Sequence, residues 1–140
     1  MDDVVLNRAA IIERCLRRVA EEYAGDPAML MNFTYQDAII LNLERACRAA
    51  IDLAMYVVAQ NHLGVPQSSS QAFDLLAQAG RIDPDLAKKM HGMVGFRNVA
   101  VHQYQILNID ILRQVVEQSR FDLVNFCAAL GIKIISANSP

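Results

Sequence analysis

The chain has 140 residues, a formal net charge of −2 and an apolar fraction of 54 %. This length indicates one domain, large enough to bury a core without a disulfide or a structural metal. The small negative charge excludes a protein that binds nucleic acid through its overall charge, so any attraction to phosphate must be local. Because the apolar fraction exceeds the usual range of about 45–50 %, we expect a second copy of the chain to cover part of the surface.

Features that would direct the chain to an oxidising compartment or a membrane are lacking. The three cysteines, Cys15, Cys47 and Cys127, are widely spaced in apolar surroundings, which predicts buried, reduced thiols rather than a disulfide or a zinc site. The acidic N-terminus predicts no signal peptide, and no apolar run reaches the roughly 20 residues that a membrane span needs. We therefore expect a cytoplasmic protein.

Helical periodicity dominates, and a first helix is predicted to end where Gly25-Asp26-Pro27 interrupts the pattern. Its apolar stripe comprises Val5, Ala9, Ile12, Leu16, Val19 and Tyr23. A longer second helix is predicted from Asn32 or Thr34 to about His62, before the helix-ending Gly64-Val65-Pro66. Its core stripe comprises Ile39, Leu43, Cys47, Ala50, Ala54 and Val57.

The opposite face of this second helix mixes apolar and charged residues. The mixed face comprises Leu41, Arg45, Arg48, Asp52 and Tyr56. It is either a solvated surface with charge pairs along the helix or a surface that contacts a partner, and the sequence favours neither interpretation.

Three further helices are predicted from their capping residues. Ser68-Ser69-Ser70 can cap a short third helix that ends at Gly80, and Asp83-Pro84 is typical of a helix start. Asn108 can cap a fifth helix that ends before Gly131. Its stripe comprises Ile109, Leu112, Val116, Leu123, Phe126 and Leu130. The sequence thus predicts an all-α bundle of about five helices over residues 1–133, with a frayed tail over residues 134–140.

One segment stands out chemically, because no acidic residue occurs from Leu86 to Ile109. The basic or potentially basic residues of this acid-free window are Lys88, Lys89, His91, Arg97 and His102. They predict a local positive region suited to a polyanion. The alternative is a helix end whose cations complement the helix dipole, which explains a lysine or two but not Arg97. We interpret His91 and His62 as structural.

Arg97 is unexpected because it is in phase with the apolar Leu86, Met90 and Met93. Burying an unpaired guanidinium is costly, so Arg97 either extends to solvent or faces a cleft where an anion or an acidic partner meets it. Gly92 and Gly95 precede it, which indicates a close backbone approach or a frayed helix.

His102 follows Arg97 by five residues, which on a continuous helix separates the two side chains by about 140°. They can converge only if the helix unwinds near Val99–Val101 or if the arginine stem curls around it. Asn98 lies four residues before His102 and can orient the imidazole ring.

These residue types suit a phosphodiester site. A neutral histidine can take a proton from a ribose 2′-hydroxyl or activate a water, and a guanidinium can hold two phosphate oxygens. Tyr104 can stack on a base or donate a hydrogen bond. The site requires no metal, in keeping with a window that has no carboxylates. We therefore predict Arg97, His102 and Asn98 as catalytic residues.

The run Arg97-Asn98-Val99-Ala100-Val101-His102 resembles the signature of HEPN domains: an arginine, a polar residue, a short spacer and a histidine. His102-Gln103-Tyr104 is similar to the HepT subgroup, the toxin half of HEPN/MNT toxin–antitoxin pairs. The resemblance covers essentially the whole chain, including five helices in this order, the long second helix and the motif before the last helix.

The resemblance implies a toxin that is a metal-independent ribonuclease and needs no cofactor. Its action can be endonucleolytic or exonucleolytic, and transfer RNA is a candidate target. It implies a homodimer whose two motifs line a shared cleft. The implied partner is a minimal nucleotidyltransferase antitoxin that uses ATP to add AMP to Tyr104. Arg48 and Asp52 are inferred from spacing as supporting residues of the cleft, and Lys88 and Lys89 of the acid-free window are predicted binding residues. The alternative is a non-catalytic HEPN module that binds RNA, a nucleotide or a nucleotidyltransferase.

Overall fold

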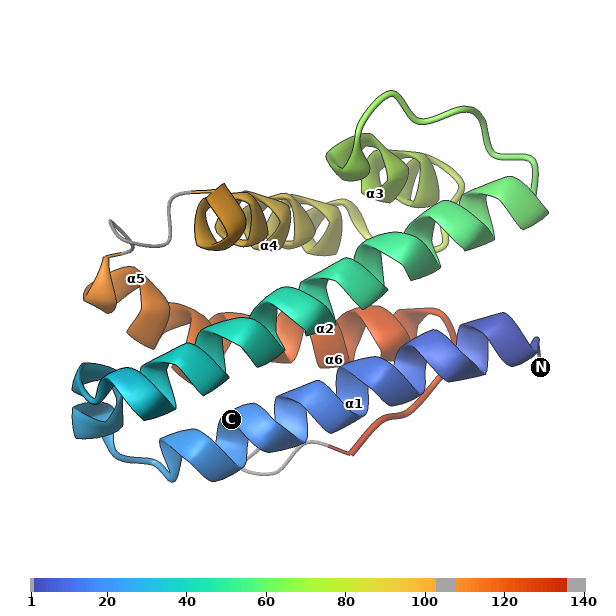
Figure 1. The fold of residues 1–140 in the computed structure, drawn as a ribbon. Coiled ribbons are helices and arrows are strands. Elements are labelled where there is room, and N and C mark those ends of the chain that lie inside the picture. The colour runs from blue at the N-terminus through green and yellow to red at the C-terminus, as the bar shows by residue number, and fades with distance from the viewer. Residues whose placement is uncertain (1, 103–107, 136–140) are drawn as a thin grey trace.

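The computed structural model describes residues 2–102 and 108–135, and within those ranges every regular element is helical (Figure 1). Two long antiparallel helices, α1 (Asp3–Tyr23) and α2 (Phe33–Gln60), lie side by side and are joined through a short 3-10 helix, η1 (Pro27–Met31). The short α3 (Ser69–Gln78) and the longer α4 (Pro84–His102) pack against one side of α2. The all-α bundle predicted from the sequence is confirmed.

The last helical rod of the bundle is made of three segments. It consists of α5 (Ile109–Gln114), a π-helical segment η3 (Val115–Ser119) and α6 (Arg120–Ala129), and it contacts α1, α2 and α4. The sequence predicted a single helix here, and the rod is indeed continuous. The wide π turn in its middle was not predicted.

Local sequence signals explain where the helices begin. The side chains of Asp2, Asn32, Ser68 and Asn108 each accept a hydrogen bond from a backbone N–H in the first turn of the helix that follows. Asp83 does the same for α4, because its carboxylate accepts from the Leu86 N–H at 2.7 Å. At the end of α1, Ala24 and Gly25 adopt left-handed backbone angles, with φ of 51° and 69°.

The predicted apolar stripes form the core. All six stripe residues of α2 are buried, and in α1 only Val5 is partly exposed. In the last rod, Ile109 and Leu130 are partly buried and the other four stripe residues are buried. Burial of these side chains is the main favourable term in folding. It also fixes which face α2 turns toward α4.

The end of the described chain continues to pack on α1. Ile134 is 7 % exposed, and the backbone N–H of Ile135 donates to Glu13 Oε2 at 2.6 Å. These contacts extend the packed chain two residues beyond the expected boundary at 133, and residues 136–140 lie outside the described residues. No helix within the described ranges is long and apolar enough to cross a membrane.

Candidate active site

Arg97 on α4 meets an acidic partner from within the chain. Its Nε lies 3.4 Å from Oε1 of Glu44 on α2, and the two side chains are 26 % and 18 % exposed. Of the sequence alternatives, the structure thus supports an acidic partner for Arg97, supplied by the chain itself. A half-buried guanidinium with one carboxylate near Nε keeps its terminal nitrogens available for a second anion.

Glu44 was not singled out from the sequence, although a signal for it existed. It is in phase with Ile40, Cys47 and Ile51 on α2, just as Arg97 is in phase with apolar residues on α4. An acid and a base that each interrupt an apolar stripe are candidates to pair across two packed helices, because an unpaired buried charge is costly. Burial raises the pKa of the neighbouring Cys47 thiol to about 12, Glu44 adds to the rise and Arg97 opposes it.

The structure does not bring Arg97 and His102 together within one chain. The helix α4 is continuous through His102, so it does not unwind near Val99–Val101. The Arg97 stem does not curl toward His102 either, because its guanidinium is directed to Glu44. Asn98 and His102 are exposed on the last turns of α4. Within one protomer, Arg97 faces α2 while His102 points to a different side of α4.

Tyr104 lies outside the described residues, in the segment 103–107 between α4 and α5. Its predicted role as the AMP acceptor therefore remains a prediction.

Neither lysine joins Arg97. Lys88 lines a hollow between α3 and α4 together with Asp74 and His91, and Lys89 Nζ lies 3.2 Å from Asp85 at the start of α4. Lys88 precedes Arg97 by nine residues, which places it on about the opposite side of the helix. The two lysines remain predicted binding residues, but the structure separates them from the Arg97–Glu44 pair.

The acid-free window is less positive in the fold than in the sequence, and this corrects the expectation of a free positive region. Three of its five basic or potentially basic side chains face a carboxylate from outside the window. Besides Lys89 and Arg97, these include His91, whose Nε2 lies 2.7 Å from Asp74 Oδ1. Asp85 precedes the window on α4 itself, whereas the packing of α4 against α2 and α3 brings Glu44 and Asp74, which a linear window cannot reveal.

Gly92 and Gly95 also differ from expectation. The helix α4 is not frayed around them, and a Cβ atom built on either would find no neighbouring atom within 4 Å. Both glycines are exposed and line a groove between α4 and α5. No close approach within the described chain requires them.

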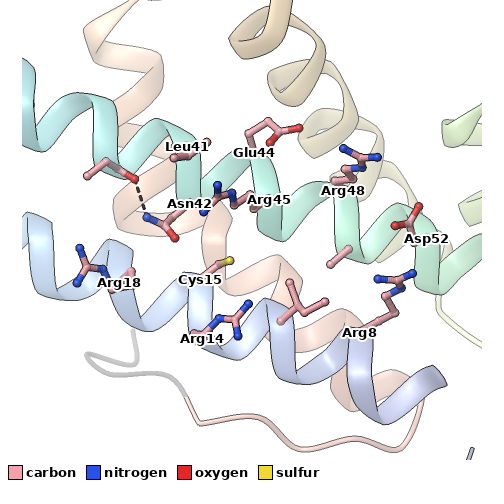
Figure 2. A pocket seen from close by; sticks show the side chains of 13 residues that line it. Arg8, Arg14, Cys15, Arg18, Leu41, Asn42, Glu44, Arg45, Arg48 and Asp52 are labelled. Atoms are coloured by element: carbon pink, nitrogen blue, oxygen red, sulfur yellow. Dashed lines mark hydrogen bonds between the residues drawn. The ribbon is translucent and has the colours of Figure 1, made fainter. Parts of the chain in front are cut away.

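Arg48 and Asp52 lie in an open groove of about 940 Å³ between α1 and α2 (Figure 2). Glu44 lines the same groove, so the two predicted supporting residues share a surface with the carboxylate that holds Arg97.

All three cysteines are buried, free thiols, which confirms the expectation of buried cysteines without a disulfide.

Comparison with known proteins agrees with this architecture. The family model described as "Ribonuclease HepT-like" matches residues 9–130. The chain is 44 % identical over 126 residues to a Shewanella oneidensis protein named mRNA nuclease HepT, with 90 % of this chain and 95 % of that protein covered.

Two solved structures are similar over almost the whole chain. One is a tri-AMPylated Shewanella oneidensis HEPN toxin in complex with an MNT antitoxin, with a TM-score of 0.88, 43 % identity, and coverage of 94 % of this chain and 98 % of that one. The other is a toxin–antitoxin structure with AMP-PNP, with a TM-score of 0.88, 42 % identity, and coverage of 93 % and 98 %.

Proposed function

Since this chain belongs to the HepT-like ribonuclease family, we propose that it is the toxin of a toxin–antitoxin pair and that it cleaves cellular RNA without a metal ion. The observation that carries the proposal is Arg97. A guanidinium on an apolar stripe, only half buried and held by one carboxylate, is placed to take a phosphate. Transfer RNA and messenger RNA are both candidate substrates, the latter because the Shewanella relative is named an mRNA nuclease.

In the proposed reaction His102 is the general acid and base. It removes a proton from a ribose 2′-hydroxyl or from a water that attacks the phosphorus, and it returns a proton to the leaving oxygen. Arg97 binds the phosphate oxygens and stabilises the charge that grows on them. Asn98, four residues before His102 on α4, orients the imidazole.

We further propose that the cleft is shared between two copies of the chain. The support is geometric, because a continuous α4 directs Arg97 and His102 of one copy to different sides. A second copy can supply the missing histidine to each arginine. An isologous dimer of this kind holds two equivalent Arg97–His102 pairs, each made by both copies, in the shared cleft.

Regulation is proposed to act on Tyr104. A cognate MNT nucleotidyltransferase would transfer AMP from ATP to the tyrosine hydroxyl, in line with the AMPylated state named for the similar toxin complex. The added phosphate would bring negative charge and bulk next to the motif, where it would compete with RNA for Arg97.

The ribonuclease proposal is tested with purified, EDTA-treated protein on total cellular RNA, resolved on a denaturing gel. We expect discrete fragments from the wild type and none from His102→Ala, with both proteins equally folded by circular dichroism. RNA that is retarded on a native gel but stays whole would contradict cleavage and identify a binding module instead. Cutting by a folded His102→Ala variant would contradict the assigned mechanism.

The regulatory proposal is tested by intact-mass analysis after incubation with the antitoxin and ATP. We expect AMP adducts on the wild type and a loss of these adducts in Tyr104→Phe. An unmodified wild type, or adducts undiminished in Tyr104→Phe, would contradict Tyr104 as the acceptor.

A further inference from the structure

The groove between α1 and α2 is rich in arginine. Its lining includes five arginines, Arg8, Arg14, Arg18, Arg45 and Arg48, against two carboxylates, Glu44 and Asp52. Figure 2 shows the first three on α1 and the other two on α2, so both helices contribute. The chain as a whole carries a net charge of −2, and this gathering therefore reverses the average charge of the molecule.

Four of these guanidiniums are available to a ligand. Arg18 is engaged by Glu22 at 2.8 Å and lies 3.9 Å from Glu21. The other four make no ion pair within residues 2–102 and 108–135. We call these four, Arg8, Arg14, Arg45 and Arg48, the arginine groove.

The chemistry of the lining favours a phosphate backbone over a protein surface. A guanidinium binds phosphate oxygens through two parallel N–H groups, and four of them around one groove can follow successive phosphates. The lining contains no Phe, Tyr or Trp, so it offers neither a stacking platform for bases nor the aromatic anchors that dominate protein interfaces. Binding here would thus read the backbone and not the base sequence.

The groove leads to the candidate active site. Glu44 lines it, and the same carboxylate holds Arg97 through the 3.4 Å contact. Arg48 follows Glu44 by one helical turn on α2, and Figure 2 shows both side chains on the side of α2 that faces α4. A single strand of RNA that lies along the groove would therefore pass next to Arg97.

We propose that the arginine groove binds the sugar–phosphate backbone of single-stranded RNA and guides it to Arg97. This inference rests on the proposed ribonuclease function and adds a substrate-binding surface to it. The groove arginines take no part in the chemical step, and their contribution is to RNA affinity.

The test measures RNA affinity apart from cleavage. A fluorescent single-stranded RNA is titrated with His102→Ala protein by anisotropy over a range of salt concentrations. Adding Arg14→Ala and Arg45→Ala, one from each helix, should weaken binding about tenfold or more at low salt. It should also lower the slope of log K against log salt by about 1.4, since each phosphate contact on a single strand contributes about 0.7.

A matched control removes the same charge elsewhere. Arg17 pairs with Glu13 and Arg81 contacts Asn61, and neither lines the groove. Arg17→Ala with Arg81→Ala should keep the affinity and the salt slope of the His102→Ala parent. Arg8→Ala with Arg48→Ala is a second groove variant, so the outcome does not depend on one pair folding well.

The proposal is overturned if both folded groove variants bind RNA like the control. It is also overturned if they change the oligomeric mass by light scattering and leave RNA affinity intact, because the groove is then an interface with a second copy. The two proposals fail separately. If the wild type cuts no RNA but its RNA affinity depends on the groove arginines, only the ribonuclease proposal is contradicted. If the wild type cuts RNA but the groove variants bind RNA like the control, only the groove proposal is contradicted.

Discussion

Two arginines of this chain interrupt apolar stripes, and they lie in different surroundings. Arg97 on α4 is partly exposed and contacts Glu44, which lines the groove between α1 and α2. Arg120, at the start of α6, is 4 % exposed, and its Nε and Nη1 atoms have no hydrogen-bond partner among the described residues. An arginine on an apolar stripe therefore marks a candidate binding site only where its guanidinium remains accessible.

The surroundings of Arg120 are those of a structural residue. Its guanidinium carbon lies 4.8 Å from the centre of the Phe121 ring, a cation–π contact directly after the π turn. Burial lowers the pKa of Arg120, with a smaller opposing effect from Tyr23. Since the folded state disfavours the charged form, the resulting loss of stability is present at every pH at which the side chain is protonated.

The largest expected effect is that of Arg97→Ala on RNA cleavage. We expect the rate to fall by about 10²–10³, because one group that stabilises the developing phosphate charge is removed. The melting temperature should fall modestly, because Glu44, which is 18 % exposed, loses its ion-pair partner, but the variant should remain folded. Single-turnover cleavage and thermal melting measure the two quantities. A rate within a few-fold of the wild type would contradict the role of Arg97.

Arg120→Met should leave RNA cleavage unchanged and act on stability instead. Replacing a buried, unpaired charge by an apolar side chain of similar length is often neutral or stabilising, by about 1–4 kcal/mol. We expect unchanged cleavage and a free energy of unfolding, from urea titration, that equals or exceeds that of the wild type. A clear loss of stability would show that the Arg120 charge is favourably compensated and would remove the contrast with Arg97.

Gly95→Ala probes the groove between α4 and α5 with a smaller change. Alanine favours a helix interior over glycine by about 1 kcal/mol, and no described atom obstructs the added methyl group. Urea unfolding should therefore show a stability gain of about that size. If the variant is stabilised but cleaves RNA more slowly, a second copy or the RNA approaches the helix at this position. Gly25→Ala, at a φ of 69°, is a contrasting variant that should be destabilised.

The smallest expected effect is on the pH dependence of stability, through a contact of Tyr23 with Glu117. The Tyr23 hydroxyl donates to Glu117, and this bond, together with Arg113, holds the pKa of Glu117 below its usual value. A lowered carboxyl pKa gives stability that is present above the unfolded value and is lost as pH falls through the folded value. Between about pH 5 and pH 3 the wild type should lose more stability than Glu117→Gln. Equal losses in acid unfolding curves would contradict the contact.

Helix boundaries were readable from the sequence because local chemistry sets them. Asp83 followed by Pro84 predicted the start of α4, and Asn108 predicted the start of the last rod. The π turn was not predictable from periodicity. The apolar periodicity on both sides of the π turn is typical of an α-helix. The extra residue in the turn depends on tertiary packing, which the periodicity does not report.

The site was only partly predictable for a related reason. The exposure of His102 and the half-burial of Arg97 follow from the phase of α4, whereas the partner of Arg97 depends on how α2 packs on α4. The packing of α3 on α4 brings Asp74 to His91, which reduced the positive region expected from an acid-free window. Contacts between helices that are distant in sequence cannot be read from the charge of one segment.

The most direct test of a phosphodiester site made by Arg97 and His102 of two copies is to mix Arg97→Ala with His102→Ala. Each variant alone should be inactive. After random exchange of equal amounts of subunits, half of the dimers are mixed and hold one intact Arg97–His102 pair of the two, so RNA cleavage should return to about a quarter of the wild-type rate. Mixed dimers that form, as verified by mass, but cleave no more RNA than either variant alone would contradict the shared site.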